Sequence, residues 1–253
     1  MKYLIAMLVM LCGVTAQAQE YEIRSEFMAC KLNEGKTLRD AIEQSRRYGE
    51  FSAAAGTQYM QAVLTPIHAG DTSAYDYLLW GQWPSGQAMY EEWGNYTNEF
   101  WRWMADQEEP MEPAGTCNWS VAMFNTATAH SRIPVEERDL WQPHQFADCK
   151  LKDGATLEQV IDMQARHGEM MKEGGFAGWG THIFTPYLGF DPQWPYDFVQ
   201  MNHWYNFAHR GQMADNWLAF LEEHPEVQSE TDALVSCERD RSFAVQLIFN
   251  NQN

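Results

Sequence analysis

The chain has 253 residues, 45% hydrophobic and 21% charged, a composition that is typical of folded globular proteins and excludes intrinsic disorder. Asp and Glu number 35 against 17 Lys and Arg. The resulting net charge of −18 repels phosphate backbones, so nucleic acid is not an expected partner. Aromatic residues make up 14% of the chain, which predicts a core or pocket rich in rings.

The first 18 residues have the pattern of a secretory signal peptide. Lys2 gives a short positive start, residues 3–14 are almost wholly apolar, and Ala16-Gln17-Ala18 matches the small-x-small cleavage pattern. We expect cleavage after Ala18 and export of the mature protein to the periplasm or the medium. No later apolar run reaches about 18 residues, so no membrane span is expected.

The rest of the chain is an internal repeat. Residues 30–38 read CKLNEGKTL and residues 149–157 read CKLKDGATL, an offset of 119. A period this long indicates two copies of a small domain rather than a solenoid. We place the first copy at 19–130 and the second at 131–253. Further matches in the same order are Thr65-Pro66 with Thr185-Pro186, Trp83 with Trp204, and Cys117 with Cys237.

Each copy is predicted to contain the same six elements. A strand ends at Cys30 or Cys149, and a helix begins after Thr37 or Thr156, whose hydroxyls can cap its first turn. The later elements are strands at 59–66 and 75–83 (180–186 and 196–204 in the second copy), an aromatic-rich helix, and a strand at 118–125 (241–250). This βαββαβ order is the ferredoxin-like split βαβ.

Two βαββαβ units of this size resemble the dimeric α/β-barrel superfamily, which includes antibiotic-biosynthesis-type monooxygenases. The resemblance implies that two ferredoxin-like sheets pack face to face and close one barrel, usually between two chains. Because this chain carries both halves, the expected fold class is α+β, with two ferredoxin-like repeats forming a pseudo-dimeric α/β barrel. Both a monomer and a homo-oligomer are compatible with that arrangement.

Four cysteines follow the signal segment and allow three pairings. In the split βαβ sheet the first and last strands are antiparallel neighbours, which places Cys30 beside Cys117 and Cys149 beside Cys237. We therefore predict one disulfide in each copy, in agreement with export to an oxidising compartment. Two alternatives stay open: four free buried thiols, and a four-thiolate zinc site, although no CxxC spacing is present.

Histidines of the second copy are the candidate catalytic side chains. A hairpin places His182 nearly opposite His203, and Asn202 adds a neighbouring amide; the first copy has Ala62 and Gln82 in place of the two histidines. Two imidazoles at this distance can bind a metal ion or divide acid and base roles. The alternative is that both are partly buried histidines without a chemical role. The sequence assigns no particular metal or cofactor.

The resemblance also implies two kinds of haem chemistry. Haem-degrading members of the superfamily use an Asn, a His and a Trp, for which Asn202, His209 and Trp204 are available. No Asn can be placed on the first strand of the second copy, which departs from that pattern. Chlorite-dismutase-like haem proteins also duplicate this fold and bind haem through a helical His, to which His167 corresponds loosely.

Aromatic side chains on the third strands form the candidate pocket. Asn202, Trp204 and Tyr205 resemble the polar and aromatic lining of cofactor-free oxygenases in the superfamily. The remaining candidates for such a lining are Trp83, Tyr77, Phe198 and Trp80. Plain core packing is the alternative for all of these rings.

Three functions are compatible with these features. We expect an exported protein that binds a small apolar or aromatic molecule between sheet and helices, with cofactor-free, monooxygenase-like oxidation as the enzymatic version. The first alternative is a metal- or haem-dependent oxidoreductase that uses histidines of the second copy. The second is a non-enzymatic module that binds another envelope protein.

Overall fold

A computed structural model describes residues 23–70 and 73–252. The predicted signal peptide and its cleavage site lie outside the described residues. Both copies fold with the predicted βαββαβ order, and each adds a short helical segment after its second helix. No helix in the described ranges is long and apolar enough to cross a bilayer.

The first copy begins with a strand and a capped helix, as predicted. Thr37 caps the helix in a reciprocal capping box with Asp40, which satisfies two amides of the first turn. The segment Tyr96–Phe100 is a π-helical turn that joins two α-helices. The elements are β1 (Ile23–Leu32), α1 (Leu38–Ala54), β2 (Met60–His68), β3 (Tyr77–Trp83), α2 (Gly86–Asn95), α3 (Trp101–Ala105) and β4 (Gly115–Ser131).

The second copy repeats this plan and adds a longer final helix. Thr156 and Gln159 form the equivalent capping box. A short 3-10 turn at Val135–Glu137 precedes the copy. Its elements are β5 (Gln142–Leu151), α4 (Leu157–Glu173), β6 (Trp179–Leu188), β7 (Phe198–Trp204), α5 (Phe207–Glu223), α6 (Pro225–Leu234) and β8 (Val235–Asn250).

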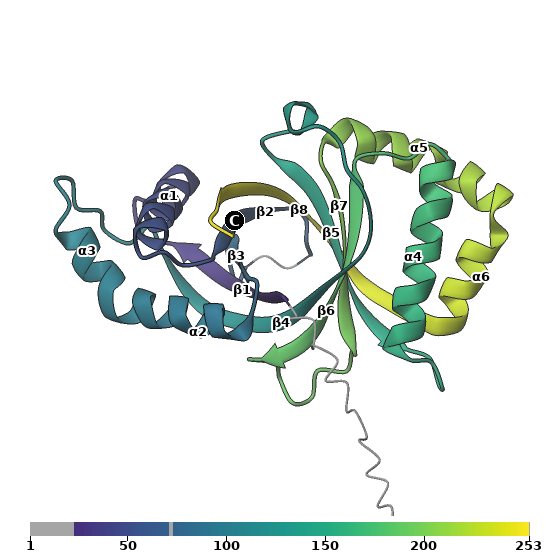
Figure 1. Cartoon of the computed structure of the whole chain (residues 1–253), viewed down its shortest axis with the longest axis horizontal. Helices are drawn as coiled ribbons and strands as arrows, with labels where there is room; N and C mark the ends of the chain where they lie inside the picture. Colours follow the sequence, from purple (N-terminus) through teal and green to yellow (C-terminus); the bar gives the residue numbers. More distant parts are fainter. Residues whose placement is uncertain (1–22, 71–72, 253) are drawn as a thin grey trace, which may run out of the picture.

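The eight strands close one antiparallel barrel, in the order β1-β3-β2-β8-β5-β7-β6-β4. The two copies meet at β2 with β8 and at β4 with β6, so each copy completes the sheet of the other. Helices α1, α2 and α3 lie outside one side of the barrel, and α4, α5 and α6 lie outside the opposite side (Figure 1). The expected pseudo-dimeric α/β barrel is therefore confirmed.

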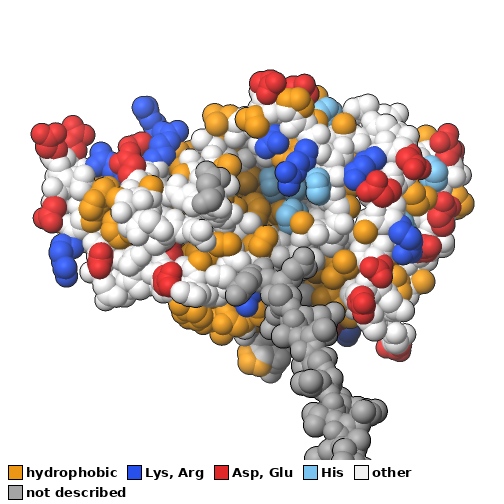
Figure 2. Space-filling view, in the orientation of Figure 1, with side chains coloured by type: hydrophobic (Ala, Val, Ile, Leu, Met, Phe, Trp, Pro, Cys, Tyr) orange, Lys and Arg blue, Asp and Glu red, His pale blue; other side chains and the backbone are white. Residues whose placement is uncertain are grey.

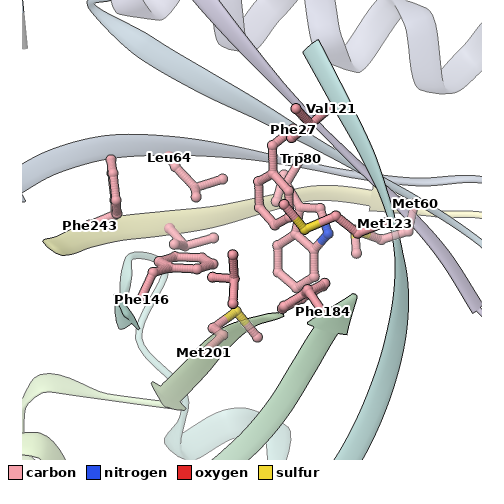
Figure 3. Close-up of a cluster of buried hydrophobic side chains, with 13 residues drawn as sticks. Phe27, Met60, Leu64, Trp80, Val121, Met123, Phe146, Phe184, Met201 and Phe243 are labelled. Carbon is pink, nitrogen blue, oxygen red and sulfur yellow. The ribbon is translucent and has the colours of Figure 1, made fainter. Parts of the chain in front are cut away.

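Apolar side chains from both copies fill the inside of the barrel (Figure 3). Phe27 of β1 contacts Phe146 of β5 and Phe184 of β6, with ring centroids 5.7 and 5.5 Å apart. Trp80 stacks on Phe27 in the same cluster. Because this core is built from both sheets, neither copy could bury it alone.

Both predicted disulfides are present. Cys30 pairs with Cys117 across β1 and β4, and Cys149 pairs with Cys237 across β5 and β8. All four sulfurs are thereby used, which excludes the four free thiols and the thiolate zinc site. Each bond links the first and last strands of one copy, as the split βαβ topology requires.

Candidate functional site

A cavity of about 550 Å³ lies between the sheet of the second copy and the helices that cover it. Strands β5, β6 and β7 supply its floor, and α4, α5 and α6 supply its walls. Its volume lies within the range of pockets that bind small molecules. The apolar part of the lining consists of Met163, Met171, Trp179, Trp204, Met213, Ala214, Trp217 and Val227.

The tryptophans give the cavity rigid, flat surfaces. Trp179 and Trp204 are buried, and they are directly opposite each other across β6 and β7. The guanidinium of Arg210 lies over the ring of Trp204, with its Cζ 4.6 Å from the ring centroid. A cation held in this way at the cavity wall can attract an anionic group of a ligand.

A row of hydrogen-bonded polar side chains crosses the cavity floor. Gln164 Nε2 donates to Gln200 Oε1 at 2.8 Å, and Gln200 Nε2 donates to Asn202 Oδ1 at 3.5 Å. Thr181 Oγ1 also donates to Asn202 Oδ1, at 2.9 Å. These contacts occupy the oxygen of Asn202, and no acceptor among the described residues pairs with its Nδ2. The row therefore ends on a donor suited to a carbonyl or an oxyanion of a ligand.

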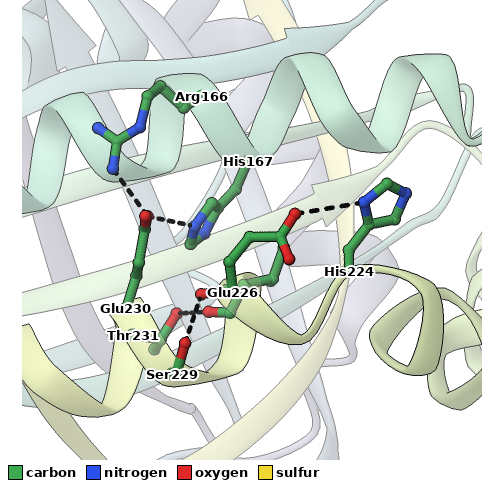
Figure 4. A network of polar contacts seen from close by, with 8 residues as sticks. Arg166, His167, His224, Glu226, Ser229, Glu230 and Thr231 are labelled. Atoms are coloured by element: carbon green, nitrogen blue, oxygen red, sulfur yellow. Dashed lines mark hydrogen bonds and ion pairs between the residues drawn. The ribbon is translucent and has the colours of Figure 1, made fainter.

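His167 of α4 adds a neutral imidazole to the cavity lining. Its Nε2 lies 3.1 Å from Glu230 Oε2 on α6, and Arg166 Nη2 donates to the same oxygen at 2.7 Å (Figure 4). Burial lowers the pKa of His167, an effect that the Glu230 contact opposes only in part. The hydrogen bonds from Arg166 and His167 lower the pKa of Glu230, so this carboxylate accepts and His167 Nε2 carries the proton.

The corresponding space in the first copy is filled with rings. Tyr48 stands where the second copy has His167, and its ring contacts those of Tyr59 and Phe100 at centroid distances of 5.6 and 5.0 Å. Phe249 of β8 packs against Tyr48 and Tyr59, and Ala129 of β4 takes the equivalent position on the other side of the barrel. The cavity is thus a feature of the second copy rather than of the fold.

A second hollow, of about 210 Å³, lies at one mouth of the barrel. His144, His182 and His203 line it, and all three are largely or fully buried. The rings of His182 and His203 have centroids 5.4 Å apart, so these two histidines lie together as predicted. Figure 2 shows histidines gathered in a hollow near the middle of the molecule, between the two halves.

Asn202 does not join the two histidines. It lies on the cavity side of the sheet, where it contacts Thr181 and Gln200, whereas His182 and His203 point into the barrel mouth. The reason is the alternation of side chains along a strand, which sends neighbouring residues 202 and 203 to opposite faces. The structure therefore brings His182 and His203 together and places Asn202 on the other face of the sheet, while His203 lines both hollows.

The predicted aromatic residues are also divided among several regions. Trp204 lines the cavity and Tyr205 lines the barrel mouth. Trp83 belongs to the packed aromatic cluster of the first copy, and Tyr77 and Phe198 pack beside Cys30 and Cys149, in each case as core residues. They form no common pocket, because β3 and β7 belong to opposite sides of the barrel.

Several residues of the two hollows were not singled out from the sequence. Three of them could have been found by aligning the two copies, because they differ between the copies. Gln164, Gln200 and His144 stand where the first copy has Ser45, Leu79 and Ser25. Glu230 lies on α6, which has no counterpart of similar length in the first copy, and the repeat gives no signal for it.

No protein-family model and no curated protein matches the sequence. Among solved structures, a chlorite dismutase-like protein is 12% identical, with a TM-score of 0.51 over 92% of this chain and 96% of that chain. An anthrone oxidase-like protein is 10% identical, with a TM-score of 0.46 over 92% and 93%. A heme-binding protein from Thermus thermophilus is 9% identical, with a TM-score of 0.48 over 88% and 91%. The chain therefore has the tandem dimeric α/β-barrel fold seen in chlorite dismutase-like proteins.

Proposed function

We propose that this protein binds a flat, mostly apolar molecule with one acceptor or anionic group in the cavity of the second copy. The observation that carries the proposal is the cavity itself, which lies where the second copy departs from the packed first copy. Trp179 and Trp204 suit an aromatic ring system, while Asn202 Nδ2 and Arg210 suit an oxygen atom at its edge.

Oxidation of the bound molecule without a cofactor is the enzymatic form of this proposal. His167 would take a proton from a phenol-like substrate, because it is neutral and belongs to the cavity lining. Substrate activation of this kind stays a prediction from the resemblance. Binding is the part of the proposal that the cavity geometry supports directly.

Haem is the second candidate ligand, and His167 is the observation that favours it. A metal-binding imidazole usually donates its other ring N–H to a carboxylate, and His167 donates Nε2–H to Glu230, which leaves the lone pair on Nδ1. Methionine and tryptophan side chains give the apolar surroundings that a porphyrin needs. When bound, haem would supply iron-centred redox chemistry.

Binding can be tested with a dye of the expected chemistry. Anilinonaphthalene sulfonate, a flat aromatic anion, should bind one site per chain and gain fluorescence. Ala214 lines the cavity where the first copy has Trp93, so Ala214→Trp should weaken binding by about tenfold or more, or about 1.4 kcal/mol. Ala219→Trp, at an exposed position on the same helix outside the lining, should leave binding unchanged. Equal affinity in all three proteins would contradict the proposal.

Haem binding has its own spectroscopic test. Addition of haemin to the protein should give a one-to-one shift of the intense visible band if His167 binds the iron. His167→Ala should abolish the shift but keep the dye binding, whereas exposed His68→Ala should change neither. If haemin gave the same spectral shift with the His167→Ala protein as with the unaltered protein, His167 would be excluded as a ligand of the haem iron.

The proposed location is outside the cytoplasm. Two disulfides persist in oxidising compartments, and residues 1–18 have a secretory pattern. After expression of the full chain, the mature protein should start at Gln19 and be recovered from the periplasm or the medium. Recovery of unprocessed protein from the cytoplasm would contradict this proposal. Binding to another envelope protein and the oligomeric state stay predictions.

A further inference from the structure

Three histidines from three adjacent strands meet at the mouth of the barrel. His144 of β5 is directly opposite His203 of β7, and their ring centroids are 5.3 Å apart. His182 of β6 lies on the other side of His203, at 5.4 Å. The first copy has Ser25, Ala62 and Gln82 at these three positions, so the imidazoles belong to the second copy alone.

Hydrogen bonds fix the protons of two of these rings. The backbone carbonyl of Gln142 lies 3.2 Å from His144 Nδ1, so Nδ1 donates and Nε2 keeps its lone pair. The Oδ1 of Asn125 lies 2.9 Å from His182 Nδ1, and the Nδ2 of Asn125 is 3.2 Å from Gln82 Oε1. That second contact orients the Asn125 amide, so His182 Nδ1 is also the donor. A histidine that binds a metal through one ring nitrogen usually donates the N–H of its other ring nitrogen to an oxygen such as a carbonyl, as both of these rings do.

The third ring has a buried nitrogen without a partner. His203 is 9% exposed, and its Nδ1 makes no hydrogen bond to any described residue. A buried polar atom of this kind costs about 1–3 kcal/mol unless a ligand satisfies it. Gly180 faces this ring across β6 and β7, and a Cβ at Gly180 would overlap the imidazole. The glycine therefore makes room for His203.

The charge state of the cluster suits a metal ion. Burial lowers the pKa of His144 to about 3 and that of His182 to about 4, and burial places the pKa of His203 well below its usual range. The charged and titratable groups around the cluster are His130 and Arg138, and no carboxylate contributes to these shifts. The rings are thus neutral near pH 7 and offer lone pairs rather than protons.

We propose that His144, His182 and His203 bind one divalent transition-metal ion, such as Zn²⁺ or Cu²⁺, at the barrel mouth. Three imidazoles with an open fourth position form a donor set that these ions accept. In the described part of the chain no three such side chains already meet at one point, so binding requires His203, the ring whose Nδ1 has no hydrogen-bond partner, to turn about its side-chain bonds while His144 and His182 keep their hydrogen bonds. The hollow of about 210 Å³ above them gives the space for this movement.

This site is distinct from the ligand cavity, although His203 lines both hollows. His144 and His182 line the barrel mouth and not the cavity, and the proposal does not depend on what the cavity binds. Arg138 and Tyr205 stand at the mouth, with the guanidinium Cζ 4.3 Å from the tyrosine ring centroid. An ion at the cluster would therefore face a small anion or water that enters past this pair.

The test is a metal titration of the mature, untagged protein after treatment with a chelator. Calorimetry with Zn²⁺ and with Cu²⁺ should show one site per chain, and Co²⁺ should give the visible absorption of a tetrahedral ion. His203→Gln introduces the residue that the first copy carries as Gln82, and it should weaken binding at least a hundredfold. Asn125→Ala, which removes the support of His182, should weaken binding about tenfold.

Controls make each outcome decisive. His68→Gln changes an exposed histidine outside the cluster and should leave affinity unchanged. Circular dichroism should show that the His203→Gln and Asn125→Ala proteins are folded. No binding by the unaltered protein, or stoichiometric binding that survives His203→Gln, would overturn the proposal.

Discussion

Next to the helices of the first copy, Tyr48, Trp93 and Phe249 fill the space behind the sheet, whereas His167, Ala214 and Ala129 take these positions next to the helices of the second copy. Phe249 and Ala129 come from β8 and β4, so each belongs to the copy opposite the helices that it packs on. Each change replaces a larger side chain with a smaller one. Because interiors are packed to crystal-like density, removal of two large rings leaves a hollow that the backbone does not close. A hollow large enough for a small molecule can therefore arise in one copy of a duplicated fold by side-chain volume alone.

The glycines of the first helices show that the backbone of the two copies is alike at this point. Gly49 faces Phe249, where a Cβ would lie 2.6 Å from the ring. Gly168 faces Ala129 in the same way, and a Cβ on residue 168 would overlap the Ala129 Cβ, so even alanine requires a glycine there. The second copy thus keeps the close approach of helix and strand while it lacks the ring.

The buried acids differ as well. In the first copy Glu26 accepts a hydrogen bond from Trp93 Nε1 at 3.3 Å, and Tyr48 donates to Glu92 at 2.5 Å. The second copy has Gln145 in place of Glu26 and Met213 in place of Glu92. Its carboxylate, Glu230, comes instead from α6 and reaches the cavity through His167. Next to the helices, the first copy has buried acids inside its packing, and the second copy has a partly exposed acid beside its hollow.

Removal of a disulfide should have the largest effect and should be equal in both copies. The bonds close loops of 87 and 88 residues, so each should stabilise the fold by about 4–5 kcal/mol in the chain-entropy model. Urea unfolding of the double variants Cys30→Ser with Cys117→Ser, and Cys149→Ser with Cys237→Ser, measures both losses. A large loss in one copy only would show that the copies differ in more than side-chain volume.

Phe249→Ala should destabilise the protein by about 3 kcal/mol, because it removes a ring from the packed side. The variant reproduces the Ala129 arrangement in the first copy. The control is Leu247→Ala, an exposed position on the same strand, which should cost little. A loss for Phe249→Ala as small as that of the control would mean that the first copy is not tightly packed.

Glu26→Gln should stabilise the protein at pH 7, and it places the residue of the second copy in the first. Burial raises the pKa of Glu26 above its ordinary value of 4.5. The unfolded carboxyl therefore loses its proton first, and ionisation opposes folding as the pH rises above about 4.5. The gain should be present at pH 7 and absent below about pH 4 in thermal unfolding. A gain that does not depend on pH would contradict this cause.

The strand and helix order, both caps and both disulfides were predictable because the repeat shows each signal twice. Cys30 with Cys149 and Thr37 with Thr156 fix equivalent points of one topology. The closeness of His182 and His203 also followed from the hairpin.

The cavity was not predictable in this way, since its volume depends on residues brought together from different copies. Ala129 belongs to β4 of the first copy but packs on α4 of the second, and Glu230 lies on a helix outside the repeat. The separation of Asn202 from His203 could have been predicted, because neighbours in a strand face opposite ways.

Hydrogen exchange with and without anilinonaphthalene sulfonate tests the central claim most directly, because it reports which copy holds the ligand. The dye should protect α4, α5 and α6 from exchange and leave exchange in α1, α2 and α3 unchanged. Equal protection on both sides of the barrel, or protection of the first copy alone, would contradict that claim.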